Sequence, residues 1–159
     1  MSNPETEPAE PIRGRCLSIL AKSPPNALEA LVARFATRND ASVAEASWLR
    51  QPEVGMVMVQ GRMGGDGQPF NLGEMTVTRC ALRLGDGTVG HGYTFGRRPA
   101  HAELIARLDA ALQQEDHRGP LAAEVLGPLN RSVASAAERR SAKSNATKVD
   151  FFTLVRGEN

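Results

Sequence analysis

The chain has 159 residues, and its 19 basic and 18 acidic side chains give a formal net charge of +1. This length suits one domain with a substantial core, and the near-neutral charge provides no global field to recruit nucleic acid or an anionic membrane. No apolar run approaches the roughly 18 residues of a membrane-spanning helix, and no basic-then-apolar signal pattern opens the chain. We therefore expect a cytoplasmic protein that binds neither nucleic acid nor membrane.

The first eleven residues are predicted to form a disordered tail, because proline and glutamate dominate them. Residues 12–159 then form the single domain. Helical spacing of apolar residues begins at Ile12, and Ser23-Pro24-Pro25 ends that helix because proline cannot continue it. A second helix is predicted to start at Asn26, whose side chain would cap it together with Glu29.

Between Val43 and Phe95 the apolar pattern alternates, and 11 of the 15 glycines lie between Gly55 and Gly96. Alternation and glycine-rich turns predict a β-meander. The turn Gly85-Asp86-Gly87 favours a tight hairpin, since these residues tolerate positive φ. The expected strands are Val43 to Arg50, Val54 to Arg62, Met75 to Leu84 and Thr88 to Phe95.

Two of these strands have unusual apolar patterns. The strand from Val54 to Arg62 is apolar on both faces, which fits a central strand or a face covered by a partner. In the strand from Met75 to Leu84 the apolar phase switches faces at Thr78-Arg79. Because side chains alternate with a period of two, the switch predicts either a bulge or a strand that leaves the core and enters an interface.

The C-terminal part is predicted to be mostly helical. A helix should run from Pro99 to about Gln114, followed by a polar loop over Glu115 to Gly119. A short helix over Leu121 to Leu126 should end at Gly127-Pro128, and a longer one should cover Leu129 to about Ser144.

The last segment, Lys148 to Arg156, reads as a strand with two apolar faces, which must add to this sheet or to another subunit's. The predicted fold class is thus α+β, with one antiparallel sheet of four or five strands flanked by helices.

Two glycine-rich motifs suggest phosphate binding, but each lacks part of the pattern that such binding needs. The loop Gly61 to Gly67 lacks the GK[ST] ending of a P-loop, and a strand rather than a helix should follow Gly85-x-Gly87-x-x-Gly90. Arg62 and Arg79 flank the first loop and could together hold a phosphate or carboxylate. Pairing of these arginines with Asp66, Glu74 or a neighbouring subunit's acids is the favoured interpretation.

Other polar residues offer no complete active site. Glu74 is the most plausible isolated carboxylate, and His91 is interpreted as a partly buried strand residue rather than a base or ligand. No nucleophile has an evident base, no histidine spacing suits a metal pair, and the two cysteines are expected to be buried thiols. The cluster Arg139-Arg140-x-x-Lys143 is interpreted as a solvated basic helix face. We therefore assign no catalytic residue and no metal site.

Several sequence blocks follow one another in a fixed order between Gln60 and Gly157. They are Gln60-Gly61-Arg62-Met63-Gly64-Gly65, Phe70-Asn71-Leu72-Gly73-Glu74, Thr76-Val77-Thr78-Arg79-Cys80, Gly85-Asp86-Gly87-Thr88-Val89-Gly90, Gly96-Arg97, His101-Ala102-Glu103 and Val149-Asp150-Phe151-Phe152-Thr153-Leu154-Val155-Arg156-Gly157. Taken together, these blocks resemble the PhnG family, the small subunits of the bacterial carbon-phosphorus lyase system, and the resemblance holds from about residue 12 to the end. Arg98 departs from the family pattern, in which an acidic residue commonly follows the Gly-Arg pair.

The resemblance implies an accessory, structural subunit in a complex with PhnH, PhnI and PhnJ. In that family the assembly replaces the adenine of ATP by methylphosphonate, giving α-D-ribose 1-methylphosphonate 5-triphosphate. The displacement is associated with PhnI, so this chain is expected to hold no cofactor, with ATP and methylphosphonate as substrates of the complex. The alternative is a stand-alone nucleotide- or phosphate-binding protein that uses the glycine-rich loop.

Overall fold

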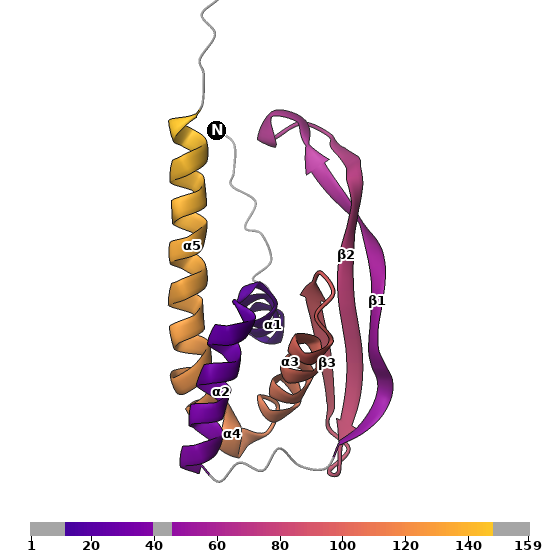
Figure 1. The fold of residues 1–159 in the computed structure, drawn as a ribbon, viewed down its shortest axis with the longest axis vertical. Coiled ribbons are helices and arrows are strands. Elements are labelled where there is room, and N and C mark those ends of the chain that lie inside the picture. The colour runs from indigo at the N-terminus through magenta and orange to yellow at the C-terminus, as the bar shows by residue number, and fades with distance from the viewer. Residues whose placement is uncertain (1–11, 40–45, 148–159) are drawn as a thin grey trace, which may run out of the picture.

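The computed structural model describes residues 12–39 and 46–147. Within them, three antiparallel strands form one sheet in the order β1-β2-β3, and the helices lie on one side of it (Figure 1). The strands are β1 (Ala46–Arg62), β2 (Pro69–Leu84) and β3 (Val89–Phe95). The α+β class is confirmed.

The described sheet has three strands, which does not match the predicted four or five: within residues 46–95 three strands form where four were expected. The segments expected as two strands on either side of Gln51-Pro52-Glu53 form the single strand β1, with register shifts on both sides of Arg50. Because β1 is an edge strand, Pro52 can lie in it without removing an internal ladder bond. The predicted strand Lys148 to Arg156 lies outside the described residues.

The predicted turn between β2 and β3 is confirmed. Gly87 has a φ of 90°, and the Leu84 N–H donates to the Thr88 carbonyl oxygen at 2.9 Å. A hairpin therefore takes the place of the helix that a dinucleotide fingerprint would need.

The first two helices are α1 (Ile12–Lys22) and α2 (Pro25–Asn39). The predicted cap at Asn26 is wrong by two residues, because Pro25 occupies the first helical position, which proline favours, and Pro24 precedes it. The amides of Ala27 and Leu28 donate to the Pro24 carbonyl oxygen instead.

Helix α3 (Pro99–Ala111) is followed by α4 (Glu115–Leu121), where a polar loop was expected. A π-helical segment, η2 (Ala122–Leu126), then leads without a break into α5 (Gly127–Ala146). The interruption expected at Gly127-Pro128 is wrong, because Pro128 falls in the first turn of α5, where the missing N–H costs little.

Helix α3 divides the core into two parts. Its large side chains pack with α1, α2 and the later helices around Leu20, Leu28, Phe35 and Leu129. Its alanines pack on the sheet, in a cluster formed by Cys80, Leu82, Leu84, Ala102, Ala106 and Ala110.

Glycines in β3 let α3 approach the sheet closely. A Cβ atom built on Gly90 would lie 1.9 Å from the Ala106 carbonyl oxygen, and one on Gly92 would lie 1.9 Å from that of Ala102. Only glycine fits these two places, so α3 is seated almost backbone to backbone on β3.

Candidate functional site

The most conspicuous surface is the upper part of the β1–β2 ladder, which we call the arm (residues 56–76). β3 ends where Phe95 pairs with Val77, so above this point the two strands continue without a third (Figure 1). The arm carries many exposed large apolar side chains. They are Met56, Met58, Met63, Phe70, Leu72 and Met75.

Both faces of the arm are apolar. Directly opposed residues of antiparallel strands share a face. Met56 and Met58, 66% and 54% exposed, therefore lie on the face that continues from the Val54–Thr78 pair, while Met75 lies with Val57 on the other. A two-stranded ribbon is marginally stable alone, and exposed apolar patches mark interaction sites.

This geometry tests the two interpretations of the strand from Val54 to Arg62 and decides against one of them. Among the strands of residues 46–147, β1 lies at the sheet edge, which contradicts the central-strand interpretation of Val54 to Arg62. The other interpretation, a face covered by a partner, stays a prediction.

The apolar phase switch in β2 marks the point where the strand leaves the core. No bulge lies at Thr78-Arg79, because the β2–β3 pairing runs in register from Val77 to Arg83. The irregularities of the β1–β2 pairing lie on both sides of Arg50 and between Val59 and Gln60. The stretch Pro69 to Met75 is exposed throughout, so the strand does leave the core, whereas its entry into an interface stays a prediction.

The glycine-rich loop at the tip of the arm is closed by its own hydrogen bonds. The Gly67 N–H donates to the Met63 carbonyl oxygen at 2.9 Å, and the Arg62 guanidinium donates to the Gly67 carbonyl oxygen at 3.1 Å. Gly64 and Gly65 adopt positive φ to make this turn. A phosphate nest needs amides that point outwards, so this geometry does not favour phosphate binding by the loop.

The two arginines predicted to flank one anion are far apart. Arg62 pairs with Pro69 at the arm tip, and Arg79 lies ten residues further along β2, roughly 33 Å at 3.3 Å per residue. The Arg79 Nε lies 2.7 Å from Glu53 Oε1, which also accepts Arg50 at 3.3 Å. Arg79 is thus paired with an acid of this chain, but with Glu53 rather than with the expected Asp66 or Glu74, and the separation of the two arginines excludes a joint clamp.

Glu74 and His91 are also separate. Glu74 lies opposite Met58 on the arm and has no described hydrogen-bond or ion-pair partner in residues 12–39 and 46–147. The His91 side chain is exposed, so its predicted partial burial is wrong. The reason is that glycines occupy the α3-facing positions of β3, which turns the intervening side chains to solvent.

Asp109, a residue that the sequence analysis missed, closes the free edge of β3. It is 2% exposed and accepts from Arg13 at 2.9 and 2.7 Å and from the His91 backbone N–H at 2.9 Å. Gln113 donates to the Val89 carbonyl oxygen at 2.8 Å, as Arg13 does at 3.3 Å. An aspartate inside the apolar stripe of α3 was the available signal.

The remaining reactive groups form no catalytic constellation in the described part of the chain. Burial raises the pKa of the Cys80 thiol to about 11 and, more weakly, that of half-buried Cys16. Both thiols are therefore poor nucleophiles at neutral pH. Across residues 12–39 and 46–147, no group of three histidine, cysteine or acidic side chains could hold a metal ion.

Comparison with known proteins agrees with this picture. The family model described as "Phosphonate metabolism protein PhnG" matches residues 12–157. The chain belongs to the PhnG family. A relative from Rhizobium meliloti (strain 1021), named α-D-ribose 1-methylphosphonate 5-triphosphate synthase subunit PhnG, is 48% identical over 119 residues, 72% of this chain and 73% of the relative. None of the helices described here is long and apolar enough to cross a membrane.

Proposed function

We propose that this chain is an accessory, structural subunit of an α-D-ribose 1-methylphosphonate 5-triphosphate synthase. The complex replaces the adenine of ATP by methylphosphonate, and this chain contributes no cofactor of its own. Its partners are PhnH-, PhnI- and PhnJ-type subunits in the cytoplasm, with the catalytic residues on the PhnI-type subunit. The name of the 48% identical relative supports this assignment.

The observation that carries the proposal is the uncovered arm. Burial of one large apolar side chain contributes about 1.5–3 kcal/mol. Six such side chains could therefore contribute on the order of 10 kcal/mol, which exceeds the lower estimates of the cost of association. A surface of this kind is typical of subunits whose interface resembles part of a core.

The test is co-purification with the PhnI-type subunit. We expect wild type to form a stable complex, and the double variant Met56→Ser/Met58→Ser to bind at least tenfold more weakly, because two exposed anchors are lost. Affinity should be measured by calorimetry on purified subunits, with the melting temperature of each free chain as a folding check. The matched control is Ile12→Ser, which removes an 83% exposed apolar side chain far from the arm.

Two results would contradict the proposal. One is a monodisperse wild-type monomer with no affinity for the PhnI-type subunit. The other is a double variant that assembles as tightly as the Ile12→Ser control, which would move the interface away from this part of the arm.

A further inference from the structure

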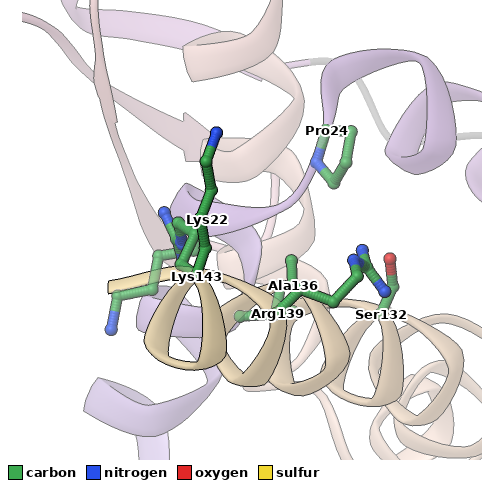
Figure 2. Close-up of a pocket in the computed structure, with 8 residues that line it drawn as sticks. Lys22, Pro24, Ser132, Ala136, Arg139 and Lys143 are labelled. Carbon is green, nitrogen blue, oxygen red and sulfur yellow. The ribbon is translucent and has the colours of Figure 1, made fainter. Parts of the chain in front are cut away.

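A basic groove lies on the opposite side of the molecule from the sheet, where the end of α1 meets α5. Its main hollow has a volume of about 390 Å³. Figure 2 shows Lys22 and Lys143 at one end and Arg139 extending along α5 towards Ser132, with Pro24 across the hollow. The described residues that line it are Lys22, Pro24, Ser132, Val133, Ala136, Arg139, Arg140 and Lys143.

The groove continues along α1. A second hollow of about 200 Å³ shares Lys22 and Val133 with the first and adds Arg15. Five cationic side chains from two helices thus border two adjoining hollows, and among residues 12–39 and 46–147 no carboxylate lines either of them. Glu138 precedes Arg139 in α5 but lies outside both linings.

These cations have no evident structural role. Within the described parts of the chain, no ion pair joins any of the five to an acidic side chain, whereas Arg13, Arg79 and Arg107 all have such partners. Arg139 and Lys143 are also spaced i,i+4 on α5, where like charges destabilise a helix by a few tenths of a kcal/mol. In a chain whose net charge is only +1, this is a local concentration of positive charge.

We propose that this groove binds the triphosphate group of a nucleotide or of a ribose 5-triphosphate. The proposal rests on the proposed function, because it concerns the substrate class of that complex. Four cations line the main hollow, against about four negative charges on a triphosphate. Arginine and lysine are the side chains that recognise phosphate, and Ser132 adds a hydroxyl donor.

Size and shape favour a small polyanion over a macromolecule. A volume of about 390 Å³ lies within the range of small-molecule sites, about 300–1,000 Å³. Among the described residues no aromatic side chain lines either hollow, so they provide no stacking platform for a single-stranded nucleic acid. Apolar Pro24, Val133 and Ala136 form part of the wall and reduce the water that competes for the charges.

The experiment measures binding of tripolyphosphate, ATP and AMP to the purified full chain by calorimetry at fixed ionic strength. We expect tripolyphosphate and ATP to bind with similar affinity, and AMP at least tenfold more weakly because it carries one phosphate. The double variant Arg139→Ala/Lys143→Ala should weaken tripolyphosphate binding at least tenfold. The matched control, Arg131→Ala/Arg83→Ala, removes the same charge from exposed sites outside the groove and should change affinity less than twofold.

Three outcomes would overturn the proposal. They are no measurable tripolyphosphate binding by wild type, equal weakening in the groove and control variants, and displacement of tripolyphosphate by an oligoglutamate peptide at lower concentration than by ATP. Circular dichroism of each variant separates lost binding from lost helix.

Failure here is distinguishable from failure of the proposed function. If the wild-type chain assembles with the PhnI-type subunit but does not bind tripolyphosphate, only the groove assignment is contradicted. A chain that binds tripolyphosphate but no partner subunit contradicts the subunit assignment.

Discussion

The two ends of the β1–β2 ladder contrast in what covers them. At the lower end β2 lies between β1 and β3 and buries Cys80, Leu82 and Leu84 against α3. At the upper end the same two strands form the arm, whose equally apolar side chains face solvent. Apolar content therefore marks a surface that needs a cover, while the layout of the other elements decides whether this chain supplies it.

A methyl group added at a glycine should give the largest difference in stability between the two ends of the ladder. Gly92→Ala places a Cβ atom 1.9 Å from the Ala102 carbonyl oxygen and 2.7 Å from the Cys80 sulfur, so α3 must shift. We expect the free energy of unfolding, measured with urea, to fall by about 3 kcal/mol or more. Gly55, at the base of the arm, has nothing within 4 Å of such an atom, and Gly55→Ala should change it by no more than about 0.5 kcal/mol. Equal losses of unfolding free energy in the two variants would contradict the close packing of α3 on β3.

Removal of negative charge gives a second comparison. Asp109→Asn removes the charge from a buried acceptor of Arg13 and of the His91 amide, which should cost about 2 kcal/mol in urea unfolding. Glu74→Gln on the arm makes the same chemical change at an exposed site without a described partner, and should be nearly neutral. A neutral Asp109→Asn would mean that the β3 edge is held by Gln113 instead.

The smallest expected effect is a pH dependence of the folding stability, caused by the buried His101 in α3. His101 is 2% exposed, and neither ring nitrogen has a hydrogen-bond partner among the described residues. Desolvation, aided by nearby Arg98, lowers its pKa below the ordinary 6.5. The unfolded chain therefore binds the proton more readily, so stability should be complete above about pH 6.5 and decline as the pH falls below it.

Urea unfolding between pH 7.5 and 5.5 tests this expectation. His101→Leu should flatten the decline, because it removes the buried titrating group, whereas His117→Leu in α4 should leave the decline intact. An identical slope in wild type and His101→Leu would contradict it.

Local signals predicted local structure well. The turn at Gly85-Asp86-Gly87 and the start of α3 at Pro99 follow from backbone preferences that need no distant partner. Strand number was not predictable in this way, because Gln51-Pro52-Glu53 reads as a connection unless the chain is known to lie at a sheet edge. The helix over Glu115 to Leu121 was missed for a similar reason, since tertiary packing of Leu121 and its neighbours outweighs a polar composition.

The site was less predictable than the fold. The pattern in β1 predicted a partner-covered face, but the roughly 33 Å between Arg62 and Arg79 depends on how far the hairpin extends. The basic groove could be recognised only in part, because Lys22 and the α5 cations are far apart in sequence and meet through the packing of α1 on α5.

The two outer edges of the described sheet differ in how readily they can pair with another strand. Arg13, Asp109 and Gln113 occupy backbone groups of β3, while no described strand pairs with the outer edge of β1. Of the two outer strands in the described sheet, β1 is therefore the more open to an added strand. Two copies that met edge to edge would do so through β1 about a twofold axis, which would place their arms at opposite ends of one six-stranded sheet.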